Sequence, residues 1–511
     1  MIRKTLYALI DTCNNFVVIH YRAVLIILFL LTIPMAYFYS QQRHENHIGI
    51  YFDRDNEDLV YYREFQEKYG NEEFIMVVFK EPDIFTVKNM DVIRDITSSL
   101  KNIDGVQRAL SLTEVKEAYG EADSISFRPV IPDNYTEDSL TGLKNRVLAD
   151  RNLVNSVISP DGTTTAIFAQ LQPFRDEKKR HLVNTVIDEV EKAGSGRTEL
   201  HIAGVPVVEA RMNILSARDY NLFVPITLLI IFILVAINLR NWTLSLLTLA
   251  NMLLIFAWGI GIYCMAGQTF NMLTVILGPM LLTTAVEHSI HVLSQFEEDY
   301  IASDGRNNYA DLVRMTIREV WIPCFLTSAT TAMGFLSFGK ATVQPVQTIG
   351  IYTAIMVLLG FIITMVFMPA ALMFLQNRMH KQISWKTRNS VQAHDSGIIM
   401  HLLMKLVNFD VRHYKPISII MTGLLLISAA IGIYKLHFET NTIQYLTEKD
   451  STKSDIRFIE KNLGGSIPFA ITIQAKTPEY DFSNPESLKL IDRAQRDLMD
   501  ISNGKYTYSF S

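Results

Sequence analysis

Apolar and polar residues alternate along this chain in long blocks. Seven blocks are apolar over about the 20 residues that a helix needs to cross a bilayer. They are Ala23–Tyr39, Leu222–Leu239, Leu244–Ala266, Leu273–Val292, Val320–Phe338, Ile349–Leu375 and Pro416–Tyr434. The first has no small-residue cleavage site after it and is longer than the apolar part of a signal peptide, so we expect it to remain as a span. The pattern predicts a polytopic helical membrane protein, with spans two to six forming one block over residues 222–375.

Lysine and arginine gather in alternate flanks of these spans. The flanks on one side carry Arg3, Lys4, Arg22, Arg240, Arg306, Arg314, Arg318, Arg378, Lys381, Lys386, Arg388, Lys405, Arg412 and Lys415. The short loops on the other side carry only Lys340. Because basic loops stay in the cytoplasm, the N-terminus and the linker 376–415 are predicted to be cytoplasmic. Residues 40–218 and 435–511 are then predicted to lie outside.

Residues 1–22 carry apolar side chains at helical spacing, among them Leu6, Leu9, Ile10 and Val17. This spacing is typical of an amphipathic helix on the cytoplasmic membrane surface. A disordered N-terminal tail is the alternative.

The polar segment 40–218 shows two periodicities. Short β-rich runs predict strands at Phe74–Phe79, Val106–Leu110, Val154–Ile158, Thr164–Leu171 and Glu199–Ala203. Helical spacing predicts helices at Val87–Leu100, Thr136–Ala149 and Arg175–Lys192. The turn Ser159–Gly162 predicts a hairpin between the third and fourth strands. The order of these elements suggests an α+β domain made of two ferredoxin-like units.

The region after the last span resembles the region after the first. Tyr51-Phe52-Asp53, Tyr62-Arg63-Glu64-Phe65, Lys68-Tyr69-Gly70 and a strand at Phe74–Val78 follow the first span. His437-Phe438-Glu439, Ile456-Arg457-Phe458-Ile459, Lys461-Asn462-Leu463-Gly464 and a strand at Phe469–Ile473 follow the last. The segments that lead into the two spans, which we call the approach sequences, are also similar. They are Val18-Ile19-His20-Tyr21-Arg22 and Val411-Arg412-His413-Tyr414-Lys415. We interpret this as duplication of a unit with one span, an outer domain and five spans, with chance similarity as the alternative. The second copy stops early, so we expect the chain to be truncated.

One carboxylate lies inside the fourth span. An ionisable side chain near the centre of a membrane helix costs about 2.5–3.5 kcal/mol on insertion scales, so Glu287 is a candidate for function. His288 adjoins it, and His291 and Thr283 lie one turn away on the same helix face. A carboxylate beside imidazoles can exchange protons, which predicts a proton relay. Alternatively, Glu287 is a static polar anchor and His291 reaches interfacial water. Zinc would need ligands from more than this one helix, so no metal is expected.

Other polar and special residues in the spans are candidates for gating or packing. Asn251 is interpreted as an interhelical hydrogen-bonding residue or a relay member. Asp219 is either a gate or a solvated carboxylate at a helix start. Pro279 and Pro323 predict kinks that act as hinges. Close helix packing is predicted at Gly334, Gly350 and Gly360.

Composition narrows the class of protein. The chain has 511 residues, 49% apolar and 19% charged, and its mean hydropathy of +0.17 suits spans plus aqueous domains. A net charge of −5 does not favour binding to nucleic acid. The three cysteines show no disulfide or zinc spacing. The sequence has no Walker motif and no GxSxG, so we expect neither nucleotide hydrolysis nor another enzymatic activity, and no cofactor.

Several motifs resemble the resistance-nodulation-division (RND) superfamily, in particular its MMPL/Patched-like predicted exporters with a sterol-sensing-type helix block. They are Gly204-Val205-Pro206, Ser289-Ile290-His291-Val292-Leu293, the run Thr327–Phe338 (TSATTAMGFLSF) and Met368-Pro369-Ala370-Ala371-Leu372. Many relatives carry Asp-Tyr in span four where this chain has Glu287-His288, so the carboxylate is kept and the phenol is replaced.

The resemblance implies an exporter driven by the proton-motive force. Its substrate would be hydrophobic or lipid-like, and its place a bacterial inner membrane, with the outer domains in the periplasm. A lipid-binding sensor or scaffold without flux, or a SecDF-like export motor, is the alternative. Membrane lipids are expected partners, and a homo-oligomer or a periplasmic partner stays open.

Overall fold

The computed structural model describes residues 2–52, 56–69, 73–121, 124–150, 153–172, 176–194, 196–239, 241–303, 308–378, 398–437, 442–463, 465, 473 and 484–501. Among these residues, seven helical segments are long and apolar enough to cross a membrane, and they correspond to the seven predicted spans. The chain divides into two compact units. The first comprises Met1–Arg43 with Asp219–Asn441, and the second His44–Arg218 with Thr442–Ser511. Each is described in turn.

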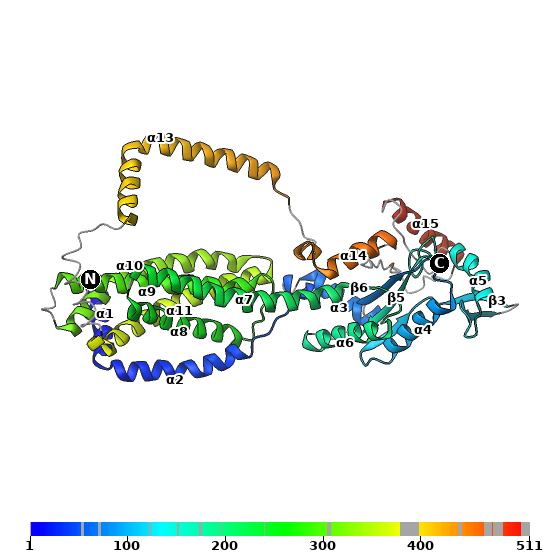
Figure 1. Ribbon diagram of the computed structural model, residues 1–511, viewed down its shortest axis with the longest axis horizontal. Helices are drawn as coiled ribbons and strands as arrows, with labels where there is room; N and C mark the ends of the chain where they lie inside the picture. Colours follow the sequence, from blue (N-terminus) through cyan, green and yellow to red (C-terminus); the bar gives the residue numbers. More distant parts are fainter. Residues whose placement is uncertain are drawn as a thin grey trace. The chain divides into compact units, whose positions relative to one another are not determined.

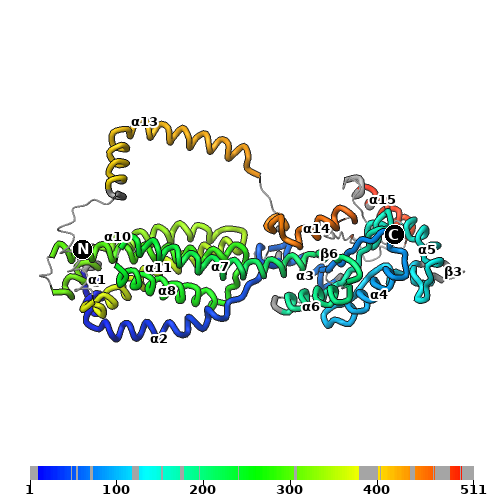
Figure 2. Tube along the Cα trace, viewed as in Figure 1, coloured from blue at the N-terminus to red at the C-terminus, as the bar shows by residue number. Residues whose placement is uncertain are grey.

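The first unit is a bundle of long helices (Figure 1). Its helices are α1 Ile2–Ile19, α2 Tyr21–Ser40, α7 Val205–Leu239, α8 Trp242–Met265, α9 Leu277–Ala302, α10 Tyr309–Leu336, α11 Gln344–Phe374 and α13 Ile398–Lys435. Helix α7 begins in the second unit. Two short 3-10 turns, η2 Thr274–Ile276 and η3 Ser337–Lys340, precede α9 and follow α10. Figure 2 shows α7, α8, α10 and α11 running alongside one another. Their buried apolar side chains form one continuous core. In α13, by contrast, no residue of the most apolar window is buried.

Side-chain caps fix where these helices begin. The amide oxygen of Asn241 accepts hydrogen bonds from the backbone N–H groups of Thr243 and Leu244 at the start of α8. Asn308 caps α10 in the same way. Such caps satisfy N–H groups that have no partner in the first turn. The polar breaks between the spans therefore define the helix ends.

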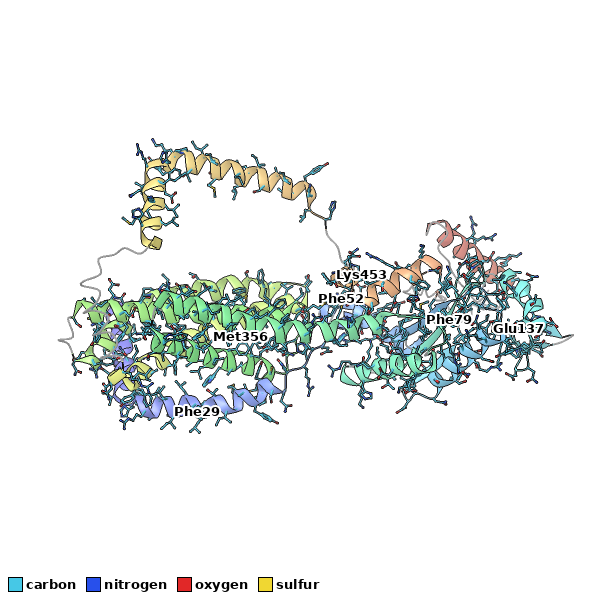
Figure 3. The ribbon with its side chains drawn as sticks, viewed as in Figure 1. Phe29, Phe52, Phe79, Glu137, Met356 and Lys453 are labelled. Carbon is cyan, nitrogen blue, oxygen red and sulfur yellow. The ribbon has the colours of Figure 1, made fainter. Side chains whose placement is uncertain are left out.

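Helix α2 packs on the bundle along a narrow seam. The indole N–H of Trp258 on α8 donates to the hydroxyl of Thr32 at 2.9 Å. Gly261 allows close approach, because a Cβ built there would lie 2.6 Å from the carbonyl oxygen of Met35. On the other side of α2, Phe29 projects outward and is 71% exposed (Figure 3). This outward apolar surface is what a lipid-facing span presents.

The repeated approach sequences fold into the same helix break. Between α1 and α2, His20 has φ −103° and ψ 27°, and within α13 His413 has φ −117° and ψ 23°. The Nδ1 of His20 lies 3.2 Å from the carbonyl oxygen of Phe16, and that of His413 lies 3.1 Å from the carbonyl oxygen of Phe409. The ring centroids of the two pairs are 4.8 and 4.7 Å apart. We call these two breaks the His20 and His413 elbows.

The second unit contains a four-stranded antiparallel sheet. Its strands are β1 Phe74–Lys80, β2 Val106–Leu110, β5 Thr164–Leu171 and β6 Leu200–Ala203, in the order β2-β5-β1-β6. Helices α4 Val87–Lys101 and α6 Asp176–Gly194 cover one face of this sheet (Figure 1). The two predicted groups of strands thus share a single sheet, which corrects the prediction of two separate units. The predicted strand Val154–Ile158 is reduced to isolated bridges.

One hairpin was not predicted from the sequence. Strands β3 Lys116–Glu121 and β4 Ser124–Pro129 pair with each other and are followed by α5 Glu137–Ala149, whose start is fixed by a capping box from Thr136. The hairpin's alternation is masked by glycine and charged residues, which have low β-propensity. It lies between β2 and β5 in the chain, so it interrupts the order of elements on which the two-unit prediction rested.

The region after the last span begins as the region after the first span does. Short 3-10 turns η1 Ile48–Tyr51 and η4 Thr442–Tyr445 precede helices α3 Glu57–Tyr69 and α14 Ser451–Asn462. Asn56 and Asp450 occupy equivalent positions before these helices and accept hydrogen bonds from their first-turn N–H groups. A last helix, α15 Pro485–Ile501, follows. Of the strand predicted at Phe469–Ile473, only Ile473 falls within the described residues.

Candidate functional site

Three consecutive polar residues of α9 face three different surroundings. Glu287 is half-buried, whereas His288 and Ser289 are 2% and 0% exposed. Successive residues of a helix point about 100° apart, so one turn of α9 directs these side chains toward different neighbours. This turn is the centre of the candidate site.

His288 is fixed between α9, α10 and α11. Its Nε2 lies 2.8 Å from the hydroxyl oxygen of Ser328 on α10. The edge of its ring meets Phe361 of α11, with centroids 6.2 Å apart. Its Nδ1 is buried and has no hydrogen-bond partner among the described residues. One ring nitrogen of His288 is therefore hydrogen-bonded, and the other has no partner among the described residues.

Glu287 stands on a more open face of the same helix. No described residue forms a hydrogen bond or ion pair with it, although the thiol of Cys324 on α10 is close enough to interact electrostatically. Thr283 and His291, one turn away on either side, are exposed. Thr283 donates to the carbonyl oxygen of Met280 in its own helix at 2.7 Å. The predicted stripe shares one face of α9, but its members are not hydrogen-bonded to one another.

A second polar cluster lies beside this turn and includes one predicted residue. Asn251 of α8 donates from Nδ2 to the hydroxyl oxygens of Ser289 and Thr364, each at 2.9 Å. The interpretation of Asn251 as an interhelical hydrogen-bonding residue is confirmed. Sequence reasoning had singled out neither Thr364 nor the hydroxyl of Ser328. Thr364 is marked in the sequence only as a hydroxyl residue within an apolar span, which is also common where no function exists. Ser328 lies in the run Thr327–Phe338 that supports the family resemblance.

Other candidate residues are placed differently from the predictions. Asp219 lies in the interior of α7, which begins at Val205, so it is not a helix-start carboxylate. Pro279 falls in the first turn of α9, where its missing N–H costs no hydrogen bond, and no kink results. Pro323 lies in the interior of α10, as expected for a hinge candidate.

Two glycines of the bundle behave in opposite ways. Gly334 is exposed, and a Cβ built there would meet no atom within 4 Å, so it mediates no close packing with a described helix. At Gly350 of α11 a Cβ would lie 2.6 Å from the carbonyl oxygen of Phe335. A close contact between α10 and α11 therefore occurs at Gly350, one of the glycines for which the sequence predicts close packing, and not at Gly334.

Metal ligands do not gather in the described part of the chain. No three histidine, cysteine, aspartate or glutamate side chains come together there in a way that could hold a metal ion. Glu287 and His291 share one face of α9, whereas His288 points about 100° away from Glu287.

Comparison with known proteins adds a family likeness. The model of the MMPL family matches residues 60–394. The chain is also 19% identical over 328 residues to the Methanocaldococcus jannaschii protein named as membrane protein MJ1562. That similarity covers 62% of this chain and 81% of the archaeal protein, whose name states no activity.

Proposed function

The chain belongs to the MMPL family, and from that premise we propose that it exports hydrophobic or lipid-like molecules, driven by the proton-motive force. As a member it is a multi-pass membrane protein of the transporter type and not an enzyme. The observation that carries the proposal is Glu287, a carboxylate on the open face of a membrane-spanning helix, next to a buried imidazole with a free ring nitrogen. The proposed location is a bacterial inner membrane, with the N-terminus in the cytoplasm and the second unit in the periplasm.

In the proposed cycle, Glu287 takes up a proton from the outer side and releases it to the cytoplasm. One charge crossing a potential of 100 mV supplies about 2.3 kcal/mol. Protonation also removes the cost of a charge within the membrane, so α9 can move against its neighbours in the neutral state. His288, held by Ser328, is placed to relay the proton through Nδ1, and His291 would continue the path toward the cytoplasm.

The substrate path and the duplicated architecture are also parts of the proposal. Hydrophobic molecules would enter between the spans or from the outer leaflet and leave through the second unit. The sheet order β2-β5-β1-β6, built from two β-α-β segments, supports a ferredoxin-like domain interrupted by the β3–β4 hairpin. The two elbows and the two 3-10 turns support duplication of the whole unit.

Replacing Glu287 with Gln tests the proton step. We expect Glu287→Gln to lower proton flux in pyranine-loaded proteoliposomes under an imposed pH gradient to the level of protein-free vesicles. Glu298→Gln is the matched control, because Glu298 is an exposed carboxylate near the end of the same helix. Unchanged flux in Glu287→Gln would remove the proposed role of this residue.

A second outcome separates transport from sensing. If the wild-type protein binds a fluorescent phosphatidylethanolamine equally well with and without a pH gradient and conducts no protons, the lipid-sensor alternative replaces the exporter. Gradient-dependent movement of the same lipid between leaflets would support export.

A further inference from the structure

The Asn251 cluster joins three spans at the level of the candidate proton site. Asn251 on α8, Ser289 on α9 and Thr364 on α11 are each 0% exposed. The amide nitrogen of Asn251 donates to both hydroxyls at 2.9 Å, and Ser289 in turn donates to the carbonyl oxygen of Ala285 at 3.0 Å. A single planar amide thus binds two helices at once.

This geometry constrains how α9 is rotated about its axis. The two N–H bonds of an amide are fixed in one plane, so both bonds can form only when Ser289 and Thr364 hold particular positions. Ser289 lies two residues after Glu287 and next to His288 on the same rigid helix. A rotation that moved Glu287 off the open face would carry Ser289 away from Asn251.

Two separate bonds hold the same turn from different sides. Ser328 of α10 holds His288, and Asn251 of α8 holds Ser289. Because buried donors and acceptors are costly to leave unpaired, losing the Asn251 bonds would favour other rotations of α9 in which Ser289 finds another partner. The Oδ1 of Asn251 is buried and has no hydrogen-bond partner among the described residues, so this oxygen can accept one more hydrogen bond.

We propose that Asn251 is a positioning residue for the proton site, which sets the rotation of α9 and thereby keeps Glu287 on the open face while His288 meets Ser328. This inference rests on the proposed function for its consequence in transport. Its structural part, the rotational setting of α9, stands independently of that function.

Cysteine labelling measures the rotation directly. In a background where Cys13, Cys264 and Cys324 are replaced by Ser or Ala, we introduce Thr283→Cys, on the open face of α9, and measure its rate of reaction with a maleimide in vesicles. Asn251→Leu is expected to change this rate by about three- to tenfold, the range for losing one or two interhelical hydrogen bonds in a membrane protein. Asn251→Gln, which keeps the amide, is expected to restore much of the wild-type rate.

Thr248→Val supplies a matched control. Thr248 is also buried on α8, but its hydroxyl donates only to the carbonyl oxygen of Leu244 in its own helix. This variant is expected to leave the labelling rate unchanged. The proposal is overturned if Asn251→Leu labels as the wild type does, or if Thr248→Val alters the rate equally. If Asn251→Leu fails to assemble, Asn251→Ser is used instead, because the shorter serine side chain lacks the amide that bonds Ser289 and Thr364. Its labelling rate is compared with those of the wild type and Thr248→Val.

Proton flux provides the second measurement. The pH at which flux is half-maximal is expected to shift in Asn251→Leu and to stay in place in Thr248→Val. If Glu287→Gln retains full flux while Asn251→Leu still changes labelling, the proposed function fails and the positioning role survives. If Glu287→Gln abolishes flux and Asn251→Leu alters neither labelling nor the flux profile, the positioning role fails alone.

Discussion

At the scale of single residues, the buried imidazole of His288 is the group most dependent on one partner. Within the described residues, Ser328 provides its only hydrogen bond, and its other ring nitrogen is unpaired. A buried polar group that loses its partner costs about 1–3 kcal/mol. The stability of the bundle should therefore be sensitive to this one hydroxyl.

We expect Ser328→Ala to lower the thermal unfolding temperature of the detergent-purified protein by several degrees, reflecting a loss of about 1–3 kcal/mol. Ser337→Ala is the control, because Ser337 is exposed near the end of α10 and donates only to the nearby carbonyl oxygen of Gly334. Equal unfolding temperatures for the two variants would show that the His288–Ser328 bond contributes little.

A pair of glycines gives a second residue-scale prediction. Gly350→Ala forces a Cβ to within 2.6 Å of the Phe335 carbonyl oxygen and 2.7 Å of the Phe338 Cβ, so we expect overpacking to cost about 1–3 kcal/mol. Gly334→Ala meets no atom within 4 Å and should be neutral or should stabilise α10 by about 0.5–1 kcal/mol. Thermal unfolding of both variants measures the difference, and the reverse order of stability would contradict the packing described for α11.

At the scale of elements, the sequence predicted where helices and strands begin better than how they face one another. Strand Thr164–Leu171 and helix Val87–Leu100 were predicted to within a residue, because the turn Ser159–Gly162 precedes the strand and apolar residues recur at helical spacing along the helix. The rotation of α9 could not be predicted. Periodicity places Thr283, Glu287 and His291 on one face, but which face meets another helix depends on partners such as Ser328, some 40 residues away in the chain.

Helix α14 shows an element docked by partners that are distant in sequence. Asp450, before its first turn, accepts from the guanidinium of Arg211 on α7 at 2.9 Å. Asp455 lies 2.8 Å from His201 on β6, whose ring stacks on Phe458 at 3.7 Å. Helix α14 therefore packs against β6, an edge strand of the sheet. No local pattern in the sequence identifies this pairing.

The carboxylate of Glu448 makes this docked element sensitive to pH. Hydrogen bonds from Arg457 and Lys453 lower the pKa of Glu448 to about 2 from its ordinary value. A lowered pKa means that the folded state holds the proton less tightly than the unfolded state. The stabilisation that the ionised Glu448 carboxylate gives to the folded state is fully present above the ordinary pKa of about 4.3, and it is lost as the pH falls toward 2.

We expect amide protection of α14 in the full-length protein to fall as the pH drops from 5 to 3, after correction for intrinsic exchange. Hydrogen–deuterium exchange with mass spectrometry measures it. In Glu448→Gln, protection should be lower at pH 5 and should change less between these values, because the titrating group is absent. An identical pH dependence in the variant would assign the effect to other carboxylates.

At the scale of the whole molecule, the likeness between the regions around the first and last spans is more extensive than the sequence first indicated. The matched segments began at Val18 and Val411, but the elbows add Phe16 and Phe409, each four residues before its histidine and with its ring tilted against the imidazole. The sequence match then extends back to Asn15 and Asn408. Short motifs of this kind become informative only when two copies adopt the same backbone angles.

If the elbows are equivalent, they lie on the same side of the membrane, and this gives a test of orientation. Arg22 and Lys415 each follow an elbow and lie near the ring of the preceding tyrosine. In a background without native cysteines, Arg22→Cys and Lys415→Cys should both react with a membrane-impermeant maleimide in inside-out vesicles and be protected in right-side-out ones. Glu137→Cys, on the exposed start of α5, should show the opposite pattern. Labelling of Arg22→Cys and Lys415→Cys from opposite sides would contradict duplication with the same orientation, since parallel repeats enter the membrane from the same face.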